Sequence, residues 1–197
     1  MYMISKEKID ELMSAAGEVR GVTLYTDAEY IRRHEGEEAL RHIEEETREM
    51  GYPIDYGEVK AMGWYPIGLR AVSLLAIRKV LDWSDEQLKE MGRAAPKYSI
   101  ITKLMLRYLG SPEALVKSLE TYWRKNYSEG SLSGKVADKS LILYLKDLEV
   151  PDPLYPYLEG YFVSILGMVI GNYEKISVEH TKWLDGDREC HELVLRW

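Results

Sequence analysis

Two histidines and the only cysteine of this chain fall in its last eighteen residues, from His180 to Trp197. Imidazole and thiolate side chains are common zinc ligands, and zinc takes four ligands, or three and a water. Cys190 and His191 are adjacent, so in a strand they point to opposite faces and reach one ion only with a bulge. We therefore predict a structural hairpin with Cys190 as a small apolar residue. Zinc held by His180, Cys190 and His191 is the alternative.

A second group of potential metal ligands is spaced four residues apart, at His34, Glu38 and His42. Gly36 interrupts this run, and eight residues of helix turn His42 by about 80° away from His34. The neighbouring glutamates make a solvated, charged helix face the better interpretation. We predict no metal site at these residues.

Familiar catalytic motifs are missing from the sequence. It has no GxSxG, GxGxxG, GxxxxGK[ST] or CxxC pattern, which would indicate a hydrolase, a nucleotide site or a redox pair. Close pairs of carboxylates arise by chance among 33 acidic residues. We assign no catalytic residue, and we favour binding over catalysis.

The aromatic residues suit either a core that meets backbone or a pocket for a ligand with a polar head. The chain has 15 Tyr and 5 Trp but one Phe, and Tyr and Trp combine a large apolar body with a polar tip. The candidates for lining a pocket are Trp64, Tyr65, Tyr157, Tyr161 and Trp183. Trp64 and Tyr65 also suit a hydrophobic staple at a helix start, which is the structural alternative.

Small residues recur along one predicted helix, at Gly160, Ser164, Gly167 and Gly171. Their spacing of four, three and four places them in one stripe. Glycine inside a helix costs up to about 1 kcal/mol relative to alanine, so something should pack closely there. The sheet or another helix is the favoured partner, and a ligand or a dimer face is the alternative.

Composition limits the class of protein. The 197 residues are 46% apolar and 30% charged, which predicts one globular domain over residues 1–197. A net charge of −7 has the wrong sign for binding nucleic acid. The start MYMISKEKIDEL contains no apolar signal segment, and the longest apolar run, Tyr161 to Ile170, is half the ~20 residues needed to span a bilayer. We expect a cytoplasmic protein without a membrane span.

The first two-thirds of the chain reads as mostly helical. Helix caps and apolar spacing predict a strand at Val19–Tyr25 and a long helix at Ile67–Leu81 that begins at Pro66. Further helices are predicted over 5–16, 28–35, 37–50, 84–95, 97–109 and 113–127. In this interpretation, Pro96 starts the helix over 97–109.

The last third alternates strands and a helix. Two strands joined near Ala137 and Asp138 precede a helix from about Leu154 to Ile170. The final strands, 175–184 and 189–197, turn at Asp185 and Gly186. The predicted fold class is α+β, with the helical N-terminal two-thirds packed on an antiparallel sheet of two late hairpins plus the early strand.

Three stretches in this order resemble one group of bacterial proteins: RGVTLYTDAEYIRRHEGEEAL, GWYPIGLRAVSLL and YLEGYFVSILGMVIGNYEKISVEHTKWLDGDRECHELVLRW. The group comprises the heme-NO-binding-associated and 4-vinyl reductase type domains, which share a fold with small subunits of the TRAPP vesicle-tethering complex. The resemblance implies this fold and a role in sensing small molecules.

Two departures concern metals and heme. The 4-vinyl reductase type ends with two cysteines around a Gly-Asp turn, and Trp183 stands where the first is expected. The heme-binding branch carries a Tyr-x-Ser-x-Arg signature and a central histidine, whereas no histidine lies between His42 and His180. We therefore predict no cofactor and do not expect heme.

Together these features predict a sensor or signalling module that binds a small apolar or amphipathic molecule between its C-terminal helix and the sheet. We expect a homodimer. The alternative is a dimeric interaction scaffold of TRAPP-like fold with no small ligand.

Overall fold

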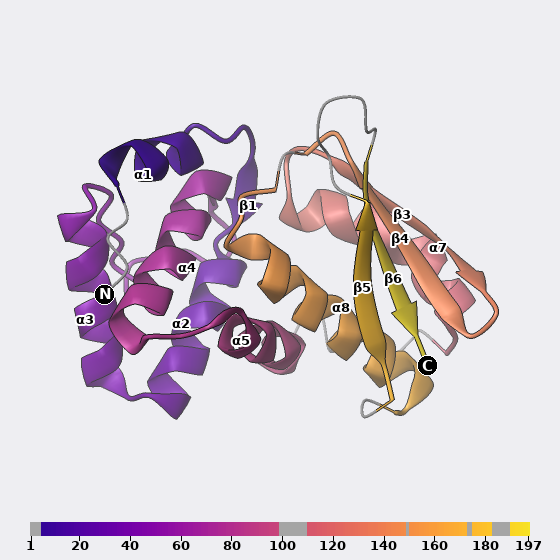
Figure 1. Ribbon diagram of the computed structural model, residues 1–197. Helices are drawn as coiled ribbons and strands as arrows, with labels where there is room; N and C mark the ends of the chain where they lie inside the picture. Colours follow the sequence, from indigo (N-terminus) through magenta and orange to yellow (C-terminus); the bar gives the residue numbers. More distant parts are fainter. Residues whose placement is uncertain (1–4, 99–109, 149, 173–174, 183–189) are drawn as a thin grey trace.

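The computed structural model describes residues 5–98, 110–148, 150–172, 175–182 and 190–197, which form seven helices and two antiparallel sheets. The helices are α1 (Lys6–Met13), α2 (Val22–His34), α3 (Glu37–Glu49), α4 (Ile67–Leu81), α5 (Asp85–Tyr98), α7 (Pro112–Asn126) and α8 (Leu154–Ile170). The strands are β1 (Glu18–Arg20), β2 (Trp64–Pro66), β3 (Ser131–Ala137), β4 (Ser140–Lys146), β5 (Ser177–Lys182) and β6 (Cys190–Arg196). The predicted α+β class is confirmed, and α8 lies between the N-terminal helices and the larger sheet (Figure 1).

The early strand is shorter than predicted, and it belongs to a different sheet. β1 ends at Arg20 and pairs with β2, with Val19 opposite Tyr65. The amide of Gly21 then donates to the carbonyl of Gly63, and a Cβ at Gly21 would lie 2.2 Å from the Lys60 carbonyl oxygen. This close approach of two backbones separates β1 from α2. The prediction of a strand from Val19 to Tyr25 was therefore wrong after Arg20.

α2 forms from residues whose types favour strands. The hydroxyls of Thr23 and Thr26 donate to the carbonyls of Arg20 and Thr23, each three residues earlier in the chain. Leu24, Ala28 and Ile31 are buried, so tertiary packing outweighs the local preference of the β-branched residues.

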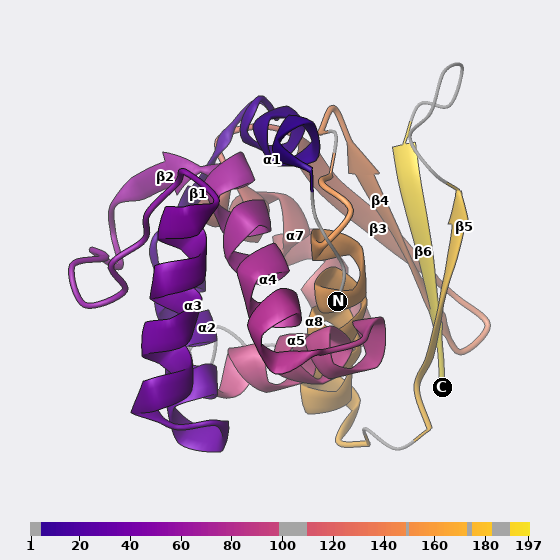
Figure 2. The same cartoon turned by 60° about the vertical axis from the view of Figure 1, so that its left-hand side comes forward.

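The larger sheet has the strand order β3-β4-β6-β5 (Figure 2). β3 and β4 pair from Ser131 opposite Lys146 to Ala137 opposite Ser140, which confirms the predicted hairpin. Asp138 and Lys139 turn it with φ of 38° and 56°. In β4, Leu141, Leu143 and Leu145 are buried, as the alternation of a strand with one covered face requires.

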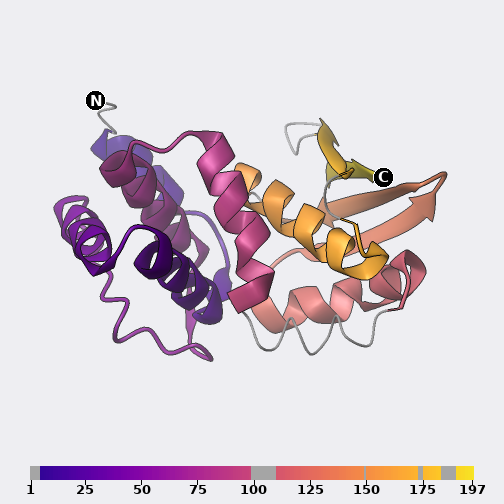
Figure 3. The same cartoon turned by 90° about the horizontal axis from the view of Figure 1, so that it is seen from below.

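α8 packs against α5 as closely as two backbones allow (Figure 3). A Cβ at Gly160 would lie 1.9 Å from the Lys89 carbonyl oxygen, and one at Gly92 would lie 2.1 Å from the Tyr157 carbonyl oxygen. The close contact expected of the small-residue stripe is present at Gly160, with α5 as the partner.

Two other predictions have different outcomes. α4 and α8 begin and end where the sequence indicated, at Ile67 and Leu81 and at Leu154 and Ile170. Pro96, however, lies inside α5, two residues before its end.

The predicted turn at Asp185 and Gly186 lies outside the described residues. Among the described residues, no helix has the length and apolar character needed to cross a bilayer.

Candidate functional site

The most deeply buried charges of the described chain form one pair between α2 and α4. Arg70 Nε donates to Asp27 Oδ2 over 3.3 Å, and the side chains are 1% and 0% exposed. Arg70 is the one charged residue of an otherwise apolar helical segment, IGLRAVSLL. A buried ion pair loses its hydration, so its hydrogen bonds must be nearly complete to be tolerated.

Two tyrosines complete the surroundings of this guanidinium. Arg70 Nη1 donates to the hydroxyl of Tyr127 over 3.1 Å, at the end of α7. The guanidinium carbon lies 4.3 Å from the ring centroid of Tyr157 on α8, which is a cation–π distance. The hydroxyl of Tyr157 interacts with the carboxylate of Asp27. One arginine therefore joins four helices.

Burial governs the protonation of these groups. It raises the pKa of Asp27, because a carboxylate is disfavoured away from water, and the charge of Arg70 opposes that effect. Burial acts to lower the pKa of Arg70, but the charge of Asp27 and its hydrogen bond, together with Tyr157 and Tyr127, outweigh burial and raise the pKa. Burial also raises the pKa of Tyr127 and Tyr157. Arg70 is thus a permanent cation and both tyrosines are neutral.

One donor and one acceptor of the pair have no hydrogen-bond partner. Within the part of the chain that the structure describes, Nη2 of Arg70 and Oδ1 of Asp27 are both buried without a hydrogen bond. Buried polar groups are hydrogen-bonded in the great majority of proteins. A group that accepts from Nη2, and one that donates to Oδ1, would therefore complete this polar centre.

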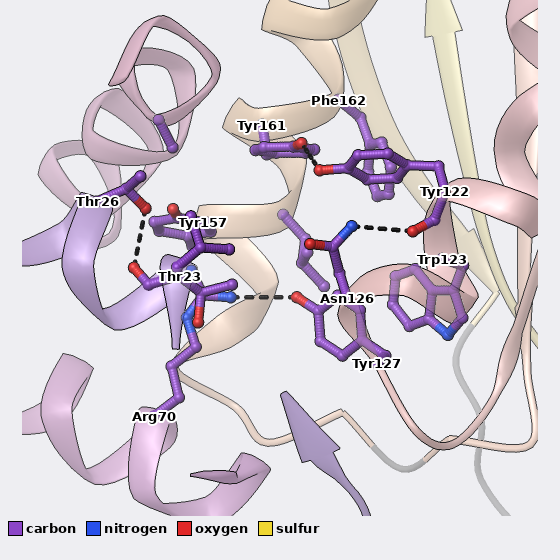
Figure 4. A pocket seen from close by; sticks show the side chains of 13 residues that line it. Thr23, Thr26, Arg70, Tyr122, Trp123, Asn126, Tyr127, Tyr157, Tyr161 and Phe162 are labelled. Atoms are coloured by element: carbon purple, nitrogen blue, oxygen red, sulfur yellow. Dashed lines mark hydrogen bonds between the residues drawn. The ribbon is translucent and has the colours of Figure 1, made fainter. Parts of the chain in front are cut away.

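Arg70 lines a cavity of about 50 Å³ among α2, α5, α7 and α8 (Figure 4). Its wall is largely aromatic. The hydroxyls of Tyr122 and Tyr161 are hydrogen-bonded across it. Trp123 stacks on Tyr127 with ring centroids 4.0 Å apart. The cavity therefore combines an apolar, aromatic wall with one charged donor.

The structure brings together only part of the predicted pocket. Tyr157 and Tyr161 line the cavity. Trp64 and Tyr65 are on β2 and do not line the cavity. The guanidinium carbon of Arg20 lies 3.8 Å from the ring centroid of Trp64. Trp183 lies outside the described residues.

Sequence reasoning missed Asp27, Arg70, Tyr122 and Tyr127. Asp27 precedes the helix predicted over 28–35, whereas it lies in the first half of α2. The available signal was Arg70, because a single charged residue within the segment IGLRAVSLL indicates a buried charge with a partner.

The C-terminal histidines form a separate cluster between α8 and the sheet. The rings of His180 and His191 are 5.4 Å apart, and Tyr155 lies 5.5 Å and 5.3 Å from them. A bulge between His180 and Lys182 interrupts the pairing of β5 with β6. His191 is buried and Cys190, its neighbour on the strand, is partly exposed. Burial, and then His180, lower the pKa of His191 to about 4.

This cluster has little space and few potential ligands. The cavity beside His191 and Leu193 has a volume of about 10 Å³. No group of three His, Cys, Asp or Glu residues suited to a metal occurs among the residues that the structure describes. The space between α8 and the sheet is therefore much smaller than that between α8 and the helices.

No protein-family model and no curated protein matches this chain. Solved structures are similar in fold. One is an H-NOX protein from S. oneidensis in the Fe(II)NO ligation state, with a TM-score of 0.67 and 13% identity over 90% of this chain and 98% of that one. Another is an oxygen-binding H-NOX domain related to soluble guanylate cyclases, with a TM-score of 0.61 and 15% identity over 90% and 94%. These comparisons show the fold, and they give no support to a 4-vinyl reductase or TRAPP relationship.

These similar structures overturn the expectation that heme is absent. Their descriptions name the function of heme distortion in the H-NOX family and the redox potential of heme. The missing signature and histidine therefore do not exclude the cofactor, because solved structures of similar fold are described with heme.

The cavity can be compared with what heme requires. Ligand pockets measure roughly 300–1,000 Å³, so a cavity of about 50 Å³ does not accommodate a macrocycle without widening. Among its lining residues, the oxygen ligands of a type known for heme iron are tyrosine hydroxyls, such as that of Tyr161. The residues therefore fit a small ligand in the arrangement described.

Proposed function

We propose that this protein is a non-catalytic sensor module that binds a small molecule in the cavity among α2, α5, α7 and α8. The observation that supports this most strongly is the buried donor of Arg70 beside a cavity with aromatic walls. Ligand sites combine a largely apolar surface with a few polar groups that orient the ligand. Tyr157 and Tyr161 are the proposed binding residues retained from the sequence, joined by Arg70 and Tyr127.

The likeness to H-NOX domains supports a sensing role, since one of these is described as oxygen-binding. Hemin is accordingly the first compound to test. Its entry requires the cavity to widen, for instance by separation of the hydrogen-bonded side chains of Tyr122 and Tyr161 in its wall.

The test is native mass spectrometry of the chain with and without hemin, together with absorption spectra in the Soret region. Because the cavity measures about 50 Å³, we expect a small molecule to bind in a stoichiometry of one per chain; hemin bound in the same stoichiometry would show that the cavity opens. Ala95 lines the cavity on α5, so Ala95→Leu fills it and should weaken binding. Ala39→Leu, on α3 and away from the cavity, is the matched control. Equal hemin binding by both variants would place the ligand elsewhere.

The same mass spectra report the oligomeric state, which bears on the scaffold alternative. A chain that stays free of ligand with hemin and in a metabolite screen, and that forms dimers, would contradict the sensor and favour the scaffold. Among the described residues, Tyr25, Met62 and Trp64 are exposed large apolar side chains, which are candidates for the contacts of such a scaffold.

A further inference from the structure

The unpartnered donor in the cavity constrains the chemistry of the ligand. Arg70 is 1% exposed, and its Nε and Nη1 are engaged by Asp27 and Tyr127. Nη2 has no acceptor among the described residues. A ligand that enters the cavity and leaves this donor unpaired forfeits a charge-assisted hydrogen bond, which is stronger than one between neutral groups.

The charge of the ligand follows from the pair. Arg70 and Asp27 already neutralise each other at 3.3 Å. An anion at Nη2 would add a second negative charge to a buried centre that holds one cation, and desolvation of that charge would oppose binding. An uncharged acceptor oxygen satisfies the donor without this cost.

The size of the ligand follows from the cavity. A water molecule needs about 10–15 Å³ of such space, so a cavity of about 50 Å³ accommodates about four non-hydrogen atoms. The rings of Tyr157 and Phe162 on α8 line it, so the part of the ligand away from the oxygen contacts apolar surface.

We propose that the cavity recognises a small uncharged carbonyl compound, such as a short amide, through a hydrogen bond from Nη2 of Arg70. This inference rests on the proposed function, because it assigns the chemical class of ligand for the same cavity. Arg70 is then the residue that determines specificity, and the aromatic wall supplies the rest of the binding energy.

Three probes of about four non-hydrogen atoms each separate charge from shape: acetamide, acetate and 2-methylpropene. Each is titrated by NMR into the wild-type chain and its variants, with the backbone amide signals of lining residues such as Tyr157 and Tyr161 as common reporters. The Nε–H signal of Arg70 is an additional local reporter in the wild-type chain. A ligand of this size binds no more tightly than roughly 0.05 mM, so millimolar concentrations are needed. We expect acetamide to shift the Arg70 signal and to bind about tenfold more tightly than either other probe, the effect of one hydrogen bond to a charged donor.

A double variant identifies the donor. Arg70→Met with Asp27→Ala removes both charges together, and we expect it to lose the preference for acetamide while still binding 2-methylpropene. Arg196→Met with Glu179→Ala removes an exposed ion pair and should keep the preference.

Each other outcome contradicts the inference in a distinct way. Binding of acetate as tight as that of acetamide would show that the cavity recognises an anion. Equal binding of 2-methylpropene would show that Arg70 does not select the ligand. In both cases the sensor function stands. Failure of all three probes overturns the inference, and the hemin and metabolite experiments then decide separately whether the module binds any ligand.

Discussion

The buried ion pair predicts a strongly non-additive effect on stability. Arg70→Met leaves the carboxylate of Asp27, which is 0% exposed, without its cation, and Asp27→Ala leaves the guanidinium, which is 1% exposed, without its anion. Removing one partner of a buried pair costs about 3–5 kcal/mol, whereas removing both is often close to neutral. We therefore expect each single variant to lose about 3–5 kcal/mol. The double variant should lose at least about 2 kcal/mol less than the sum of the two single losses.

Urea denaturation followed by far-ultraviolet circular dichroism gives the free energy of unfolding of all four proteins. The control cycle uses Glu179 and Arg196, whose side chains are 61% and 54% exposed at a distance of 2.9 Å. Exposed pairs contribute about 0–1 kcal/mol, so that cycle should show little coupling. Effects of Asp27 and Arg70 that add within about 0.5 kcal/mol would refute the coupling, as would a loss below about 1 kcal/mol in either single variant.

Two further predictions concern the two faces of α8. Gly160→Ala should lower the free energy of unfolding by about 1–3 kcal/mol, because its Cβ would lie 1.9 Å from the Lys89 carbonyl oxygen. Gly57→Ala is the control: its added Cβ would lie 3.2 Å from the flexible Asp55 Oδ1, so the free energy of unfolding should change by no more than about 0.5 kcal/mol. Thermal unfolding compares the two variants, and equal shifts of the midpoint would contradict the close contact at Gly160. The pKa of His191 is about 4 in the folded chain against 6.5 for an ordinary histidine, so the unfolded chain binds more protons between these values. Stability should therefore fall by about 2–3 kcal/mol as the pH is lowered from the ordinary to the folded pKa. His191→Gln should remove most of this dependence and exposed His42→Gln should keep it; urea titrations showing the same pH slope in both variants would contradict the assignment.

Local sequence signals predicted the parts of the fold that they determine. Pro153 before α8 and Gly171 after it, with φ of 72°, mark the two ends of that helix. Alternation in Leu141, Leu143 and Leu145 marked β4 in the same way. The start of α2 escaped prediction, because Val22 and Thr23 favour strands locally and are held in a helix by tertiary contacts.

The candidate site escaped prediction for a different reason. Arg70 is 43 residues from Asp27 and 57 from Tyr127, so no local spacing connects them. Tyr157 and Tyr161 were identified because they fall one turn apart on a helix whose limits were evident. The cluster of His and Cys attracted attention through its composition, although strand alternation separates Cys190 from His191.

The position of Arg70 also bears on how a bound ligand would act on the fold. Its guanidinium contacts α2 through Asp27, the end of α7 through Tyr127, and α8 through the ring of Tyr157. A ligand shifts a conformational equilibrium only if it binds one arrangement more tightly than another. An acceptor at Nη2 adds one more contact to a planar group that the three helices already orient, so its affinity depends on how these helices are placed. α8 also packs against the sheet through the contact of Tyr155 with His191 on β6. We therefore expect ligand binding in the cavity to change the environment of β6 through α8.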